Sequence, residues 1–153
     1  MTTLNVLNKC VKNGLTIAFA ESMTGGSACY ELIKNPGASK VVKGGMTLYQ
    51  KEIKSLWLNI DSQIIDAMGL VSQELSDLLA YRIHQQALSS IGIGITGNAG
   101  PTKDIGDAGY FAYISIYYKD NYTRIALNLE NLSREQAIKY AIHELYRKLD
   151  EII

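Results

Sequence analysis

The sequence has few cysteines and histidines and no excess of basic residues. It has two cysteines and two histidines, and its 15 Lys plus Arg balance 15 Asp plus Glu. Cys10 and Cys29 fall in predicted helices without metal-ligand spacing, which indicates reduced thiols in a cytosolic protein. The balanced charge gives no basic surface for a nucleic acid, so we expect no such partner.

Long apolar runs are also missing. The N-terminal segment lacks the apolar stretch of a signal peptide, and no part of the chain approaches the length of a membrane span. There is no repeat, linker or low-complexity segment. At 153 residues the chain has the size of one ordinary domain with one core. We therefore predict a single cytoplasmic domain over residues 1–153 with no membrane partner.

Short apolar runs alternate with helical patterns along the chain. Continuous apolar runs predict buried strands at 15–20, 44–49 and 91–96. Helical spacing of apolar residues predicts helices at 4–13, 25–34, 51–58, 61–68, 73–88 and after Ser133, with Ser72 and Ser133 as N-caps. Two more strands, 110–118 and 122–129, are expected to form an antiparallel hairpin through Lys119, Asp120 and Asn121.

This order of elements predicts the fold class. Strands that alternate with helices form parallel sheets covered on both faces, and the final hairpin adds antiparallel strands. We predict an α/β fold, a three-layer α/β/α sandwich with a mixed, mainly parallel sheet that ends in an antiparallel hairpin. Ligands bind at the carboxyl ends of strands in such sheets. Three loops meet that condition, 21–26, 49–54 and 96–101, and each carries polar or glycine residues.

Ser22 lies directly after the first predicted strand and before a predicted helix. Unpaired N–H groups at such a helix start can bind a phosphate or stabilise an oxyanion, which would suit a serine nucleophile. The simpler interpretation is that Ser22 or Thr24 caps the helix, and this stretch taken alone favours the cap. The glycines of the turn, Gly25 and Gly26, match no common phosphate-loop or dinucleotide pattern.

A serine nucleophile needs a base. His84 and His143 fall on the polar sides of predicted helices, away from any strand end, which argues against a Ser-His triad. A neutral lysine is the other option, and partial burial in the apolar segment 51–58 would lower the pKa of Lys54 from ~10.4 toward neutrality. The alternative is a solvated lysine, and the residues taken alone favour it.

Tyr49 and Thr96 end the second and third predicted strands. Tyr49 either points into the same cleft or packs at the edge of the sheet. Thr96 either donates to a substrate, from its hydroxyl or its backbone, or only begins the turn at Gly97. Each signal is weak by itself, but Ser22, Tyr49, Lys54 and Thr96 all come from one end of the predicted sheet.

Three motifs carry a family resemblance: "AESMTGG" at 20–26, "GGMTLYQKEIK" at 44–54 and "ITGNAGP" at 95–101. In the order and spacing of these motifs the chain resembles, over essentially its whole length, the CinA C-terminal domain family, whose stand-alone members act as nicotinamide-nucleotide amidases. The resemblance implies a three-layer α/β/α fold and a dimer. It also implies hydrolysis of nicotinamide mononucleotide to nicotinic acid mononucleotide and ammonia, a reaction of NAD salvage that needs no metal or organic cofactor.

The resemblance implies roles for particular residues. Ser22 matches the catalytic serine, Lys54 its paired lysine, and Tyr49 and Thr96 the family's tyrosine and threonine. In the implied chemistry neutral Lys54 deprotonates Ser22, which attacks the amide carbon. Tyr49 relays a proton to the departing ammonia, and backbone N–H groups of the Thr24 to Gly26 turn stabilise the oxyanion together with Thr96. Substrate-binding positions are expected at Glu21, Thr24, Gly25, Gly26, Gly97, Gly100, Arg134 and Lys139.

The chain departs from the family pattern in three places. Met23 replaces the usual cysteine, which rules out a thiol nucleophile there. The stretch 102–109 is shorter and lacks a Lys-Pro pair, and the second arginine near the last helix is replaced. Lys103, Arg134 and Lys139 remain as candidates to hold a substrate phosphate. Two alternatives to the amidase follow: a nucleotide-binding or regulatory module with impaired catalysis, and a hydrolase of another small amide.

Overall fold

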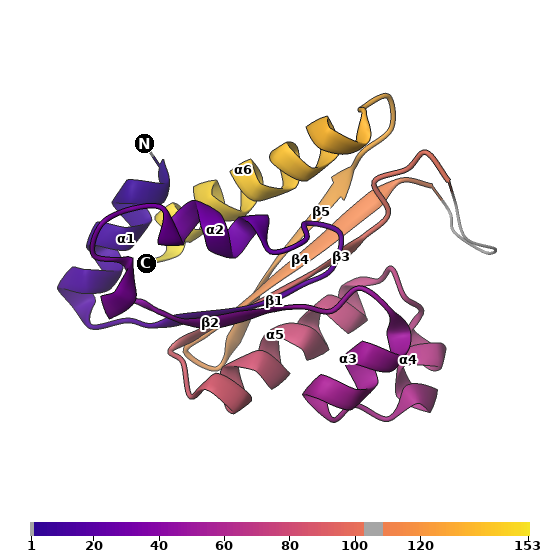
Figure 1. The fold of residues 1–153 in the computed structure, drawn as a ribbon, viewed down its shortest axis with the longest axis horizontal. Coiled ribbons are helices and arrows are strands. Elements are labelled where there is room, and N and C mark those ends of the chain that lie inside the picture. The colour runs from indigo at the N-terminus through magenta and orange to yellow at the C-terminus, as the bar shows by residue number, and fades with distance from the viewer. Residues whose placement is uncertain (1, 103–108) are drawn as a thin grey trace.

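The computed structural model describes residues 2–102 and 109–153. Its strands form one five-stranded sheet in the order β2-β1-β3-β4-β5 (Figure 1). β1 pairs in parallel with β2 and β3, whereas β4 is antiparallel to both β3 and β5. The strands are β1 (Ile17–Glu21), β2 (Val42–Thr47), β3 (Ile91–Gly97), β4 (Phe111–Tyr118) and β5 (Asn121–Asn128). This mixed sheet with its antiparallel hairpin confirms the predicted fold class.

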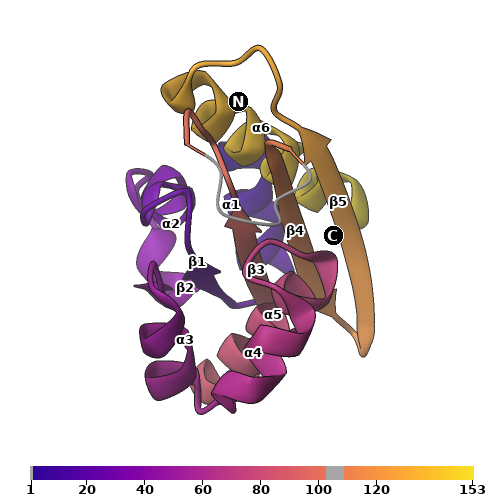
Figure 2. The same ribbon diagram turned by 90° about the vertical axis from the view of Figure 1, so that its right-hand side faces the viewer.

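Helices cover both faces of the sheet and complete three layers (Figure 2). One face carries α1 (Thr2–Asn13), α2 (Ser27–Ile33) and α6 (Arg134–Ile152), and the other carries α3 (Lys51–Leu58), α4 (Ser62–Met68) and α5 (Gln73–Ala87). A short 3-10 helix, η1 (Ala38–Lys40), precedes β2. Within the part of the chain that the structure describes, no helix is both long and apolar enough to span a membrane.

Strand β1, which lies between β2 and β3 in the sheet, is buried on both faces. Phe19 belongs to the core cluster under α1, α2 and α6, whereas its neighbours Ala18 and Ala20 belong to the cluster under α3, α4 and α5. Successive side chains of a strand point to opposite faces, so a strand between two helical layers needs apolar residues at every position. This explains the continuous apolar run in the sequence.

Two glycines of β3 set how closely α5 approaches the sheet. A Cβ atom on Gly92 would collide with the carbonyl oxygen of Ala80, and one on Gly94 would collide with that of Ser76. Any larger residue at either position would push α5 away. The close approach places the chain before α5 against the carboxyl end of β3.

Every predicted helix and strand is present within two residues of its predicted bounds. The helix predicted from residue 25 begins at Ser27, because Gly25 and Gly26 have φ angles of 62° and 92° that no helix accommodates. The predicted N-caps are confirmed, since the Oγ atoms of Ser72 and Ser133 each accept a backbone N–H from the first turn of their helix.

The hairpin turn has two residues, not the three that were predicted. Lys119 and Asp120 have φ angles of 51° and 59°, and Tyr118 pairs directly with Asn121. Two consecutive left-handed residues give the turn whose twist matches that of paired strands. Asn121 is therefore the first residue of β5.

Candidate active site

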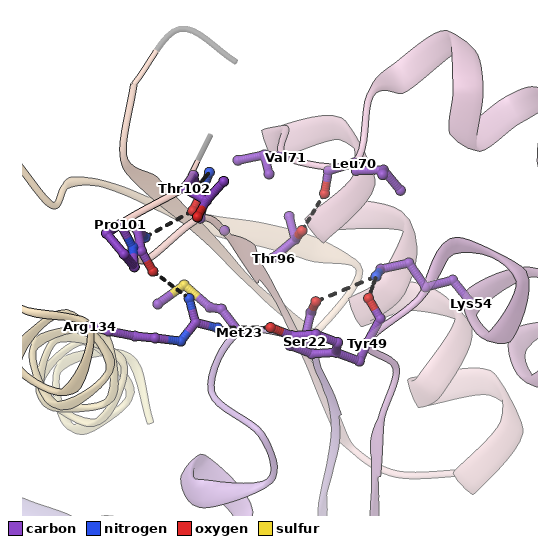
Figure 3. Close-up of a pocket in the computed structure, with 13 residues that line it drawn as sticks. Ser22, Met23, Tyr49, Lys54, Leu70, Val71, Thr96, Pro101, Thr102 and Arg134 are labelled. Carbon is purple, nitrogen blue, oxygen red and sulfur yellow. Dashed lines mark hydrogen bonds between the residues drawn. The ribbon is translucent and has the colours of Figure 1, made fainter. Parts of the chain in front are cut away.

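The chain segments that follow β1, β2 and β3 meet around a cavity of about 460 Å³ (Figure 3). Its described lining consists of Ser22, Met23, Tyr49, Lys54, Leu70, Val71, Thr96, Gly97, Asn98, Gly100, Pro101, Thr102 and Arg134. The cavity therefore contains the four candidate catalytic residues from the sequence, as well as Gly97, Gly100 and Arg134. It lies where open α/β sheets bind their ligands.

Ser22 and Lys54 meet inside this cavity. The Nζ atom of Lys54 lies 3.4 Å from the Oγ of Ser22 and donates to the carbonyl oxygen of Tyr49 at 3.2 Å. α3 carries Lys54 on its buried side together with Leu58, so the amine points toward the end of the sheet. Lys54 is 2% exposed. Its interpretation as a solvated lysine is wrong, because α3 packs with Lys54 and Leu58 on its buried side while Leu56 and Trp57 are exposed.

Lys54 lacks a counter-charge. It forms no salt bridge with any residue in 2–102 or 109–153, and both of its hydrogen-bond acceptors are neutral oxygens. Burial disfavours the ammonium form and lowers the pKa of Lys54 to about 8. With this pKa about a tenth of the lysine is neutral at pH 7 and about half at pH 8. A neutral amine beside a serine hydroxyl can serve as its base.

Neither Ser22 nor Thr24 caps α2, so the cap interpretation of this turn is wrong. The N-cap position is Gly26, which has no side chain. The carboxylate of Glu21 instead accepts two backbone N–H groups from the first turn of α2, at 2.9 and 3.0 Å. Thr24 donates its hydroxyl to the same carboxylate at 2.6 Å. A negative group at a helix N-terminus is stabilised by the helix dipole, and this leaves Ser22 free of any capping role.

Four residues predicted to bind substrate do not line the cavity: Glu21, Thr24, Gly25 and Gly26. Glu21 and Thr24 are buried and bind each other beneath the turn. The two glycines supply the left-handed backbone that the turn requires, and the N–H of Gly25 donates to the carbonyl of Ser22 at 3.0 Å. These residues hold the turn that carries Ser22 and do not line the cavity.

Thr96 is buried at the end of β3 and lines the cavity. Its hydroxyl donates to the carbonyl oxygen of Leu70 at 2.5 Å. The sequence left open whether Thr96 donates to a substrate or begins a turn. In the structure its hydroxyl ties the end of β3 to the connection between α4 and α5.

Arg134 reaches across the cavity mouth from the first turn of α6. Its Nη1 donates to the carbonyl of Gly100 at 2.7 Å, and its Nη2 donates to the Oη of Tyr49 at 2.9 Å. The side chain of Tyr49 is exposed, and its hydroxyl lies with Arg134 rather than with Lys54. Tyr49 thus points into the cleft, but its phenol is paired away from the Ser22–Lys54 pair.

Lys139, one of the basic residues considered for phosphate binding, does not line the cavity. Lys139 is exposed on α6, where its Nζ pairs with the carboxylate of Glu135, one helical turn earlier, at 3.0 Å. The helical rotation between positions 134 and 139 turns it to another face. Lys103 lies outside the described residues. Arg134 is the cationic side chain, besides Lys54, in the described lining.

Sequence reasoning missed several lining residues, of which Met23, Leu70 and Val71 are the largest apolar ones. Met23 was judged only as a replaced cysteine. It is buried, and a Cβ atom on Gly97 would collide with its Sδ. Leu70 and Val71 follow a helix, so the strand-end rule did not include them. The signal that could have found them is their place directly before the Ser72 N-cap.

No group of three or more His, Cys, Asp and Glu side chains within residues 2–102 and 109–153 is arranged to hold a metal ion. The two cysteines, Cys10 and Cys29, are buried away from the cavity in the core under α1, α2 and α6. Burial raises the pKa of each thiol to about 11. Neither thiol is a nucleophile at neutral pH.

Comparisons with known proteins agree with this architecture. A competence-damage inducible protein of Bacillus cereus strain AH187, so named provisionally, is 35% identical over 145 residues, which cover 92% of this chain and 35% of the relative. A relative from Bacillus mycoides strain KBAB4 is 34% identical over the same shares. The chain thus spans 35% of the length of these curated relatives.

Solved structures show the same fold. The competence or damage-inducible protein of Enterobacter asburiae superposes with a TM-score of 0.91 at 22% identity, covering 98% of this chain and 94% of that one. The competence damage-inducible protein A of Klebsiella pneumoniae MGH 78578 superposes with a TM-score of 0.92 at 19% identity, covering 99% of this chain and 94% of that one. The family model of the CinA C-terminal domain matches residues 2–153, and the chain therefore belongs to that family.

Proposed function

We propose that this chain is an amidase that hydrolyses the carboxamide of nicotinamide mononucleotide to nicotinic acid mononucleotide and ammonia. One observation carries the proposal: a buried lysine without a counter-charge, Lys54, lies 3.4 Å from the hydroxyl of Ser22 in a ligand-sized cavity. Such a pair has a nucleophile and a base of which a useful fraction is neutral near physiological pH. Catalytic hydrogen bonds are often this long before a substrate is bound.

In the first half of the reaction, neutral Lys54 takes the hydroxyl proton of Ser22 as the Oγ attacks the amide carbon. The C–O bond forms, and the carbonyl oxygen becomes an oxyanion. The tetrahedral intermediate then collapses, the C–N bond breaks, and Lys54 returns its proton to the departing nitrogen, which leaves as ammonia. An ester between Ser22 and the acyl group remains.

In the second half, a water molecule attacks the ester. Lys54 accepts a proton from this water, the bond between the acyl carbon and Oγ breaks, and the proton passes to Ser22. The sum is one amide and one water converted to one carboxylic acid and one ammonia. We assign the proton transfers to Lys54 rather than to Tyr49, because the Nζ of Lys54 lies 3.4 Å from the Oγ of Ser22, whereas the Tyr49 hydroxyl accepts from Arg134 and makes no hydrogen bond to Ser22 or Lys54.

The oxyanion needs donors near Ser22. The N–H of Gly25 is already bonded to the carbonyl of Ser22. The N–H groups of Met23 and Thr24 donate to no acceptor within the described part of the chain, and they belong to the turn that carries the nucleophile. Backbone donors held by a rigid turn are the usual means of stabilising such an intermediate. Met23 lines the cavity and Thr24 does not, so we assign the oxyanion site to the N–H of Met23.

The opposite end of the cavity suits an anion. The described lining includes Arg134 and no Asp or Glu side chain. Both hydrogen-bond acceptors of Arg134, a carbonyl and a phenol, are neutral, so its positive charge is not offset by a carboxylate there. An arginine in this state is a good partner for a phosphate group. A substrate with a carboxamide at one end and a monophosphate at the other matches both ends of the site.

The test is to incubate the purified protein with nicotinamide mononucleotide and to measure ammonia. We expect release that Ser22→Ala and Lys54→Ala each reduce to background. Ser62→Ala, at an exposed position of α4, and Lys51→Ala, at a partly exposed position of α3, should leave it unchanged. Binding of the nucleotide without any ammonia would instead support a binding or regulatory module. A fully active Ser22→Ala variant would exclude the proposed nucleophile.

A further inference from the structure

The hydroxyl of Thr96 has a partner within the protein. It is buried in the cavity wall and donates to the carbonyl oxygen of Leu70 at 2.5 Å. A threonine hydroxyl has one proton, so the side chain cannot donate to a second oxygen while this bond is made. The family resemblance implied an oxyanion donor at this position. The geometry directs the donor to a backbone carbonyl instead.

That carbonyl belongs to the connection 69–72 between α4 and α5, here called the 69–72 link. The link begins at Gly69, whose φ of 84° and ψ of 152° favour glycine, and ends at the helix cap Ser72. Leu70 and Val71 between them belong to neither helix. The hydrogen bond from Thr96 therefore fixes the middle of the link to the end of β3.

Leu70 and Val71 place branched aliphatic side chains on the cavity lining. In Figure 3, Thr96 lies between Leu70 and the Ser22–Lys54 pair. Leu70 is 40% exposed, so much of its apolar surface remains in contact with solvent. Covering such a surface with an apolar part of a ligand is favourable in proportion to the area that both lose to water.

We propose that Thr96 is a positioning residue: it holds the 69–72 link so that Leu70 and Val71 form an apolar wall, and this wall selects carboxamides carried on a flat unsaturated ring. The inference rests on the proposed function, since it names the part of the substrate that the site distinguishes. A rigid ring covers two adjacent aliphatic side chains at little conformational cost, whereas an open chain must be ordered to do so.

Binding measurements separate the wall from the chemistry. In a Ser22→Ala background, calorimetry compares nicotinamide mononucleotide with ribose 5-phosphate, which lacks the ring. Leu70→Ala is expected to weaken the binding of nicotinamide mononucleotide about 5- to 30-fold and the binding of ribose 5-phosphate less than about twofold. Thr96→Val should give the same pattern, and Thr96→Ser, which keeps the hydroxyl, should restore binding. Leu88→Ala, at an 83% exposed position beyond α5, is the matched control and should change neither ligand.

Turnover gives a second readout with Ser22 intact. Thr96→Val should raise KM while kcat stays within about threefold, because a displaced wall affects binding of the ring in both ground and transition states. A loss of about 100-fold in kcat at unchanged KM would identify Thr96 as an oxyanion donor and overturn the proposal. Equal weakening of both ligands, or unchanged affinity in Thr96→Val, would overturn it as well.

The two proposals fail in distinguishable ways. If the wild-type chain binds nicotinamide mononucleotide but releases no ammonia, the amidase is excluded and the binding comparison still decides the role of the wall. If the wild-type chain releases ammonia but Leu70→Ala weakens binding of both ligands equally, the wall is excluded and the amidase stands.

Discussion

Lys54 and Ser22 meet side chain to side chain, with an Nζ–Oγ distance of 3.4 Å, and the second partner of the amine is the carbonyl oxygen of Tyr49. A neutral amine fits this arrangement fully. One of its N–H groups donates to the carbonyl, and its lone pair can accept the proton of the serine. An ammonium ion in the same place loses hydration without gaining a negative partner.

The rate of ammonia release should therefore increase with pH. Because burial lowers the pKa of Lys54 to about 8, kcat/KM should rise about tenfold per pH unit below that value and level off above it. An assay between pH 6 and 9.5 measures this profile. Lys54→Arg, which cannot lose its proton in that range, should be inactive throughout. A profile that is flat from pH 6 to 9 would contradict a lysine base.

The same lysine should reduce the stability of the fold. Lys54→Met keeps a similar volume without a charge, so we expect the free energy of unfolding at pH 7 to increase by roughly 1–3 kcal/mol while activity is lost. Urea unfolding of the two proteins measures the difference. Lys51→Met replaces a partly exposed lysine of the same helix that pairs with Asp66, and it should not increase stability.

The stability difference between wild type and Lys54→Met should depend on pH in a defined window. The folded-state pKa of about 8 lies below the unfolded value of about 10.5, so the unfolded chain binds more protons between these values. Wild-type stability therefore rises, relative to the variant, as pH increases through the window, and the penalty is fully present below pH 8. A difference that stays constant from pH 7 to 10 would refute the lowered pKa.

Removing the carboxylate of Glu21 should destabilise the fold. Glu21→Ala leaves two backbone N–H groups of α2 and the hydroxyl of Thr24 without their acceptor, which we expect to cost roughly 2–4 kcal/mol. Glu21→Gln keeps one acceptor oxygen and should lose less. Thermal or urea unfolding measures both variants. Equal stability of Glu21→Ala and wild type would mean that the turn is held by other contacts.

Arg134 should determine the affinity for an anionic substrate. We expect Arg134→Ala to raise KM for nicotinamide mononucleotide about 10- to 100-fold with a smaller effect on kcat, because a charge-assisted contact to phosphate is lost in both ground and transition states. Arg147→Ala, on the same helix and paired with Glu144 and Glu151, is the matched control. Nicotinamide riboside, which lacks the phosphate, should be turned over equally poorly by the wild type and by Arg134→Ala. If Arg134→Ala still prefers the phosphorylated substrate, the phosphate binds at another residue.

The sequence predicted the fold well because each element carries a local pattern. Buried strands such as Ile91–Gly97 are continuous apolar runs, and Ser72 and Ser133 mark helix starts through a hydrogen bond made within one turn. These signals depend on neighbours in the chain. The strand-end rule likewise brought Ser22 and Lys54 to one end of the sheet, because topology alone decides which loops meet.

Contacts between distant segments could not be predicted from such patterns. The sequence favoured a helix cap for Ser22, since nothing local shows that Glu21 turns back under α2. It favoured a solvated Lys54, since burial of that side chain depends on how α3 packs. The bond from Thr96 to Leu70 joins residues 26 positions apart and has no sequence signature. In each case tertiary packing decides the role of the side chain.

The carboxylate of Glu21 beneath the Ser22 turn also bears on when the site is organised. The turn is held from the protein side, by bonds to α2 and Thr24 that involve no ligand. The entropy of ordering the backbone around Ser22 is therefore lost during folding rather than during each binding event. A ligand that enters the cavity meets the backbone N–H groups of this turn already in position, because folding alone has ordered the turn.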